Sequence, residues 1–194
     1  MSNEEILSKM RKDMEMRGFS HYTKEQYEIK VKDLMKYLNK SLEEVTVEEL
    51  RNYLLKHLRE EKGLSERSVN YYNSVIRFVY EVTMDKVINK KQLPMYRNRR
   101  RMIVVLTKEE LSAFFNACKN YKYKTIFMLV YGTGLRIGEV ANLRIEDIDS
   151  KRMRIFVRKG KGNKERYTIL PQASLEMLRK YWKMYLQYQM KFTQ

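Results

Sequence analysis

The sequence predicts a mainly α-helical protein with one small β-hairpin, organised as two units. Apolar residues return every three or four positions from Glu4 to Thr83, which is typical of amphipathic helices. Apolar and polar residues alternate over residues 154–158, and a turn-forming segment, Gly160–Asn163, follows them. Only two prolines interrupt the 194 residues, and this length is enough for two small hydrophobic cores.

Four helices are predicted in the N-terminal unit, which we place at residues 1–90. The hydroxyl of Thr23 can cap free amides at the start of the second helix, with Gln26 at the reciprocal capping-box position. Packing the four apolar stripes together leaves the polar faces free for binding. Helix boundaries are expected at or near Gly18, Thr23, Thr46, Gly63 and Ser65.

Basic residues gather between the two units, and we interpret residues 91–105 as a basic linker. The helical periodicity fades after Asp85, and Pro94 interrupts the segment. Closely spaced cations gain most by lying along phosphates, although a solvated charge run is the alternative interpretation. The cations of this region are Lys86, Lys90, Lys91, Arg97, Arg99, Arg100 and Arg101.

The second unit, residues 106–194, is predicted to begin with a helix that Thr107 caps. A helix-breaking turn at Gly132–Gly134 precedes a short helix, and the two strands of the hairpin come next. An amphipathic helix after Pro171 completes the unit.

The net charge indicates the class of partner. Lys and Arg number 40 against 24 Asp and Glu, so the formal charge is +16, and such a field attracts polyanions. A basic protein on a membrane surface is the alternative. The single cysteine, Cys118, excludes an internal disulfide, and no stretch approaches the roughly 18 apolar residues of a membrane span. We therefore expect a soluble, cytoplasmic protein that binds nucleic acid and no membrane.

Two segments of the second unit resemble a known family. Thr133–Leu143, with the sequence TGLRIGEVANL, and Asp147–Asp149 are similar to the first conserved box of the tyrosine recombinases, the phage integrase family. Gly160–Arg166, with the sequence GKGNKER, resembles the β-hairpin loop of this family. Two motifs in this order are more specific than either alone. Residues of the N-terminal unit that also resemble the family are Ser20, Thr23, Tyr27, Ser65, Ser68 and Arg77.

The resemblance implies a fold and an activity. The first unit would be the SAM-like core-binding domain, a helical bundle that forms half of a clamp around DNA. The second would be the N-terminal part of the α+β catalytic domain. The implied activity is cleavage and rejoining of DNA through a 3′-phosphotyrosine, for DNA integration and site-specific recombination. The implied partners are double-stranded DNA and other recombinase protomers, with no metal, cofactor or small-molecule substrate.

Arg136 is the leading candidate for a catalytic residue. A guanidinium stays protonated and donates two charge-assisted hydrogen bonds, so it can neutralise charge that builds on phosphate oxygens. Without the motif around it, an arginine after a turn is usually a solvated surface residue.

The resemblance gives Lys161 the role of general acid toward the leaving 5′ oxygen. Glu139, one helical turn after Arg136, is expected to hold the guanidinium, with a simple helix ion pair as the alternative.

Further residues are expected to bind DNA. Phosphate contacts should supply most of the affinity, while Asn70 and Asn73 on the fourth helix are expected to read base edges. The predicted DNA-binding residues are Lys24, Ser68, Asn70, Asn73, Arg77, Arg99, Arg100, Lys164 and Arg166.

The family pattern is incomplete in this sequence. Its H-x-x-R motif has no match, since Glu60 stands three residues after His57, and the tyrosines after the hairpin follow a buried apolar stripe. Covalent catalysis needs an attacking group near its activating cations, so we expect a truncated recombinase that binds DNA without cleaving it. A non-catalytic regulator or dominant-negative partner of a full-length recombinase is the alternative. A helical protein that binds RNA or acidic partners is a third possibility.

Overall fold

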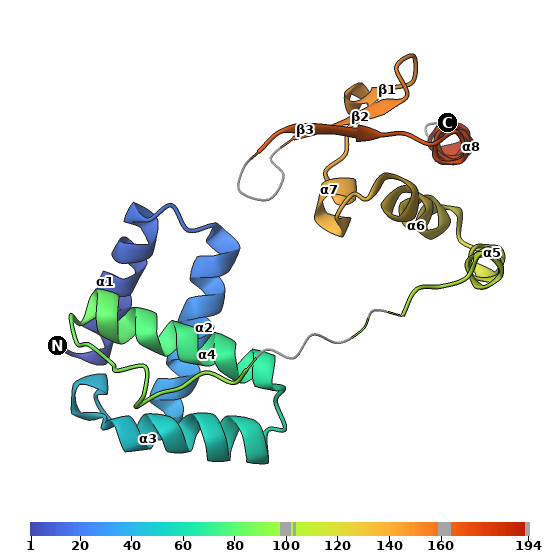
Figure 1. Ribbon diagram of the computed structural model, residues 1–194. Coiled ribbons are helices and arrows are strands. Elements are labelled where there is room, and N and C mark those ends of the chain that lie inside the picture. The colour runs from blue at the N-terminus through green and yellow to red at the C-terminus, as the bar shows by residue number, and fades with distance from the viewer. Residues whose placement is uncertain (98–101, 103, 159–163, 193–194) are drawn as a thin grey trace. The chain divides into compact units, whose positions relative to one another are not determined.

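The chain folds into two compact units, each with its own hydrophobic core, in the computed structural model shown in Figure 1. Contacts divide the chain into Met1–Met102 and Ile103–Gln194. None of the helices in the described part of the chain combines the length and the apolar character needed to cross a bilayer. The structure describes residues 1–97, 102, 104–158 and 164–192.

The first unit is a bundle of helices, drawn from blue to green in Figure 1. π-helical turns continue two of the helices, α3 as far as Glu61 and α4 as far as Thr83. A 3-10 turn at Leu42–Glu44 precedes α3. The α-helices are α1 (Asn3–Met16), α2 (His21–Leu38), α3 (Val47–Asn52) and α4 (Glu66–Arg77).

Serine hydroxyls begin α2 and α4. The side chain of Ser20 accepts a hydrogen bond from the backbone N–H of Thr23, and that of Ser65 accepts one from Ser68. Such caps satisfy amides that have no partner within the helix. The start of α2 thus lies at His21 and not at Thr23, because Ser20 supplies the same hydroxyl one turn earlier.

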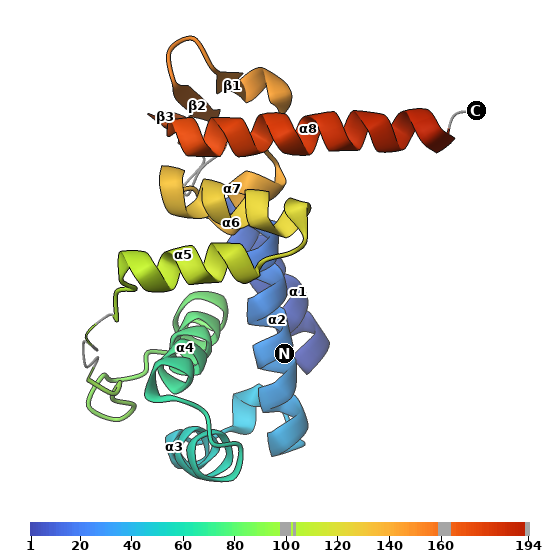
Figure 2. The ribbon, with the colours of Figure 1, turned by 90° about the vertical axis from the view of Figure 1, so that its right-hand side faces the viewer.

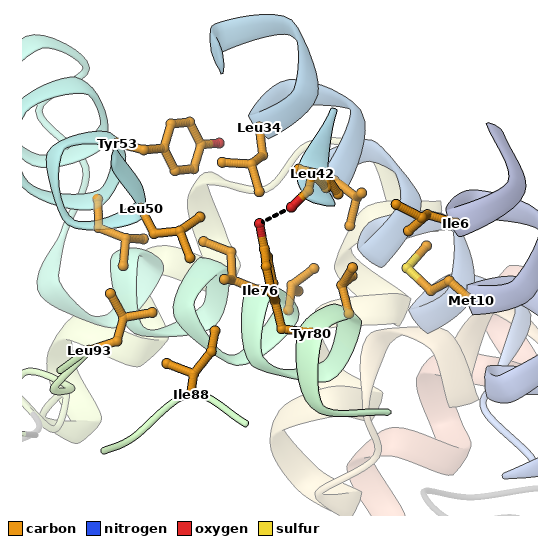
Figure 3. Packing of buried hydrophobic residues seen from close by; sticks show 14 of the residues in the cluster. Ile6, Met10, Leu34, Leu42, Leu50, Tyr53, Ile76, Tyr80, Ile88 and Leu93 are labelled. Carbon is orange, nitrogen blue, oxygen red and sulfur yellow. Dashed lines mark hydrogen bonds between the residues drawn. The ribbon is translucent and has the colours of Figure 1, made fainter. Parts of the chain in front are cut away.

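The core of the first unit also takes in the segment that follows α4. Figure 3 shows Ile88 and Leu93 packed with apolar side chains of the bundle, and Leu93 is only 1% exposed. The sequence predicts a linker from residue 91. Leu93 lies within this range, but its apolar side chain is buried in the core of the bundle. In the same core the hydroxyl of Tyr80 donates a hydrogen bond of 2.9 Å to the carbonyl oxygen of Leu42.

The second unit combines helices with a small antiparallel sheet. The strand order is β1-β2-β3, so a short strand extends the predicted hairpin. Its helices are α5 (Lys108–Ala117), α6 (Tyr121–Thr133), α7 (Ile137–Ala141) and α8 (Gln172–Phe192), and its strands are β1 (Ile148–Asp149), β2 (Arg154–Val157) and β3 (Arg166–Ile169).

Helix α8 lies alongside α6, as Figure 2 shows. A Cβ atom at Gly132 would stand 2.7 Å from Oγ of Ser174 in α8, so glycine allows the two helices to approach closely. Gly132 lies inside α6 and is not part of the turn that the sequence predicts there; the turn itself is at Gly134. Ile155 and Val157 of β2 are buried in the core of this unit.

Candidate functional site

A glycine turn places Arg136 at the surface of the second unit. Gly134 ends α6 with a left-handed backbone (φ 66°), and its N–H donates to the carbonyl oxygen of Val130. The next side chain, Leu135, is buried and anchors the turn. Arg136 then has an extended backbone and directly precedes α7. Its side chain is 57% exposed, so the guanidinium is accessible to a partner.

The carboxylate of Glu139 holds Arg136 at two points. Oε2 accepts a hydrogen bond of 2.9 Å from the backbone N–H of Arg136, and Oε1 accepts one of 3.0 Å from Nη1 of the same residue. The Glu139 side chain is only 9% exposed. The predicted pair is thus in contact, and Glu139 fixes both the backbone and the guanidinium of Arg136.

Arg166 at the start of β3 completes this group. Its Nη1 and Nη2 donate to Oε1 and Oε2 of Glu139 at 2.9 and 2.8 Å. Hydrogen bonds from Arg166, and then from Arg136, hold the pKa of Glu139 at about 2, although burial acts in the opposite direction. Two guanidiniums share one carboxylate, so the group keeps a net positive charge.

Three predicted site residues lie outside the described part of the chain. They are the predicted general acid Lys161 and the linker residues Arg99 and Arg100. Lys164, which precedes β3, is described and exposed. The described site therefore consists of Arg136, Glu139 and Arg166.

In the first unit, Lys24 and Ser68 lie at the surface with partners of their own. Lys24 forms an ion pair with Glu15, and a quarter of its side chain is exposed. Oγ of Ser68 lies 2.9 Å from Oγ of Ser65, the cap of α4. Both side chains would have to exchange these partners to bind a phosphate.

Asn70 and Asn73 hold the backbone of the segment after α4. Nδ2 of Asn70 donates to the carbonyl oxygen of Tyr96, and its Oδ1 accepts from the Tyr96 N–H, both at 2.8 Å. Asn73 is 1% exposed and donates to the carbonyl oxygens of Leu93 and Pro94. A buried amide of this kind cannot reach a base edge, so we do not retain Asn73 as a DNA-reading residue. Asn70 is only partly buried, and its amide would have to release Tyr96 to read a base, so its predicted contact stays a proposal.

Arg77 also points into the first unit. Its guanidinium donates to the carbonyl oxygens of Ile88 and Leu93 at 2.8 and 2.6 Å, and 12% of its side chain is exposed. The sequence predicts a phosphate contact here, whereas the structure shows a side chain that fastens the segment after α4. Its position near the end of an amphipathic helix does not distinguish the two roles.

The sequence analysis does not predict that two tyrosines and a lysine of the first unit, all at least partly exposed, lie together. The Tyr27 ring of α2 and the Tyr71 ring of α4 are 6.0 Å apart, and Nζ of Lys30 lies 4.7 Å from the centre of the Tyr71 ring. Burial lowers the pKa of Lys30, although Asp33 acts in the opposite direction. The signal that could have found this group is the interleaving of tyrosines and lysines along α2, where the Tyr22 side chain is 70% exposed.

Family comparisons match both units. The model of the phage integrase family matches residues 104–191, and the model of the phage integrase N-terminal SAM-like domain matches residues 6–90. Among curated proteins, the chain is 32% identical over 180 residues to the putative integrase/recombinase y4qK of Sinorhizobium fredii. It is 29% identical over 183 residues to the tyrosine recombinase XerA of Pyrococcus horikoshii. These alignments cover 92% and 93% of the chain but only 58% and 61% of the two relatives.

Solved structures share the fold. The alignment with a lambda integrase tetramer bound to a Holliday junction covers 93% of this chain and 56% of the integrase chain, with a TM-score of 0.69 at 20% identity. The alignment with the Tn1549 transposon integrase in complex with transposon right end DNA covers 94% of this chain and 65% of that integrase chain, with a TM-score of 0.64 at 19% identity. The fold is thus that of the integrases and recombinases. With both units matched by its models, the chain belongs to the phage integrase family.

Proposed function

We propose that this chain binds double-stranded DNA and that Arg136 donates hydrogen bonds to a DNA phosphate. The observation that carries the proposal is the placement of Arg136, whose exposed guanidinium follows a glycine turn and is held by Glu139. Because Arg166 shares the Glu139 carboxylate, the group remains positively charged and suited to an anion. The formal charge of +16 favours DNA binding throughout the chain.

The family supports this choice of partner. The lambda and Tn1549 integrases are described as complexes with DNA, and the lambda complex is a tetramer. We therefore propose other recombinase protomers as further partners. Lys24, Ser68, Lys164 and the linker arginines Arg99 and Arg100 remain proposed phosphate contacts, and the Tyr71–Lys30 group of the first unit joins them.

The reaction we propose for a full-length recombinase that contains these residues is metal-free cleavage and rejoining of DNA strands through a 3′-phosphotyrosine, for integration and recombination. Arg136 would neutralise the charge that builds on the phosphate oxygens, and Lys161 would protonate the leaving 5′ oxygen. The 194 residues contain no H-x-x-R motif. We therefore propose that this polypeptide binds DNA without cutting it.

Binding to a fluorescent duplex, followed by anisotropy over a series of salt concentrations, tests the role of Arg136. Replacing one phosphate-contacting cation should reduce the slope of log affinity against log salt by about 1, so Arg136→Ala should show this loss. Arg152→Ala is the matched control, because Arg152 is also an exposed arginine of the second unit with one acidic partner, Asp149. Equal slopes for the two variants would contradict the proposed role.

Incubation with nicked duplex tests the absence of cleavage. The expected result is no protein–DNA adduct that survives denaturation, because a phosphotyrosine link requires a nucleophile next to its activating cations. A denaturant-resistant adduct would show that one of the 15 tyrosines attacks DNA and would overturn this part of the proposal.

A further inference from the structure

Two side chains on one face of β3 reach the segment that carries Arg136. Oγ1 of Thr168 donates a hydrogen bond of 2.7 Å to the carbonyl oxygen of Thr133, and Arg166 donates two hydrogen bonds to Glu139. Alternate residues of a strand lie on the same face, which explains why Arg166 and Thr168 act together. Thr133 and Glu139 stand on either side of Arg136 in the sequence, so β3 supports the site from both ends.

The Glu139 carboxylate is fixed by Arg166. Each of its oxygens accepts one hydrogen bond from the Arg166 fork and one from Arg136. A two-pronged pair of this kind restricts rotation of the carboxylate. The orientation of Glu139, and with it the position of the Arg136 guanidinium, therefore depends on Arg166.

The same contact governs the charge that Arg136 presents. Without Arg166, the carboxylate of Glu139 would pair with Arg136 alone, cancel its charge and compete with a phosphate for its donors. With Arg166 present, the negative charge is shared between two guanidiniums. The pairing thus leaves Arg136 both oriented and available.

We propose that Arg166 is a positioning residue, which fixes Glu139 and thereby orients Arg136 toward the phosphate. Arg166 then acts on DNA through Arg136 and not as a phosphate ligand of its own, since both of its Nη groups are directed at Glu139. This replaces the direct DNA contact that the sequence predicts for Arg166. The inference rests on the proposed function only in its final step, the binding of phosphate by Arg136.

The positioning itself can be measured without DNA. In NMR spectra of the nitrogen-15-labelled chain, the side-chain Nε–Hε signal of Arg136 is identified by its absence in Arg136→Ala. Arg166→Ala should shift this signal, because the adjoining Nη1 donates to the Glu139 carboxylate that Arg166 holds, and Arg166→Lys should restore part of the shift. Arg152→Ala is the control that should leave the signal in place. Circular dichroism establishes that each variant is folded, and an unchanged Arg136 signal in folded Arg166→Ala would overturn the proposal.

A double-mutant cycle on duplex affinity separates positioning from direct binding. Arg166→Ala should weaken binding in the otherwise unchanged chain but alter it by less than about twofold when Arg136 is already alanine. The same loss in both backgrounds would mean that Arg166 binds DNA itself and would overturn the proposal. If Arg136→Ala alone leaves affinity unchanged, the proposed function fails, while the NMR measurement still decides whether Arg166 positions Arg136.

Discussion

Arg77 donates a hydrogen bond of 2.6 Å from Nη2 to the carbonyl oxygen of Leu93, and so fastens the segment after α4 to the helical bundle. Its Nη1 donates to the carbonyl oxygen of Ile88 and to Glu81. The contact joins residues that are 16 positions apart in the sequence, and the side chain of Leu93 is itself buried in the core. This arginine therefore stabilises the N-terminal unit, although its net charge alone would favour a role on DNA.

Arg77→Ala should lower the free energy of unfolding of the first unit by about 1–3 kcal/mol, because two backbone carbonyl groups lose their donor. Urea unfolding followed by far-ultraviolet circular dichroism provides the measurement. Arg67→Ala, an exposed position on the same helix, should change stability by no more than about 0.5 kcal/mol. Equal stability of the two variants would show that the Arg77 contacts contribute nothing.

Tyr80→Phe should also destabilise the first unit. The change keeps the ring but leaves the buried carbonyl group of Leu42 without the hydroxyl that donates to it, at a cost of about 1–3 kcal/mol. The urea midpoint of this variant is compared with that of Tyr22→Phe, where the ring is largely exposed and no comparable loss is expected. A urea midpoint equal to that of the unsubstituted chain would contradict the prediction.

Local signals were sufficient to predict much of the fold. The mainly helical class with a small sheet is confirmed, because helical periodicity and hydroxyl caps act over a few residues. The spacing of Arg136 and Glu139 also predicts that they are neighbours, and their side chains are 3.0 Å apart. Ser20 shows the limit of precision: Ser20 and Thr23 are two hydroxyls one turn apart that could each cap the helix, and the structure has Ser20 as the cap.

Contacts between distant residues could not be predicted in this way. The periodicity of α4 cannot reveal that Asn73 meets backbone carbonyl groups some 20 residues further along the chain. Arg166 and Glu139 are 27 residues apart, and only the return of β3 beside α7 joins them. A cation in a basic sequence is readily taken for a phosphate ligand, whereas its buried or paired state depends on tertiary structure.

Gly134→Ala should destabilise the second unit by roughly 1–2 kcal/mol. The residue has a φ of 66°, and an L side chain with a Cβ disfavours this left-handed backbone even though nothing lies within 4 Å of the site. Gly134→Asn should cost less, because asparagine adopts the left-handed region more readily. Fluorescence of Trp182, the single tryptophan, reports unfolding of this unit. If alanine and asparagine destabilised the unit equally, the backbone conformation would not be the cause.

Glu139 predicts how the stability of the second unit depends on pH. Hydrogen bonds from Arg166 and Arg136 hold its pKa at about 2 in the folded chain, against an ordinary value of 4.5. A carboxyl group whose pKa is lowered by folding contributes stability that is present above about pH 4.5 and is lost as the pH falls toward 2. Glu139→Gln should therefore lower the free energy of unfolding at neutral pH and flatten its decline between about pH 4.5 and 2.

Unfolding curves followed by Trp182 fluorescence at a series of pH values measure this pH dependence. Glu165→Gln, at an exposed position, is the control variant that should keep the decline. A decline as steep in Glu139→Gln as in the control would mean that the shared carboxylate does not contribute to the acid sensitivity of the unit.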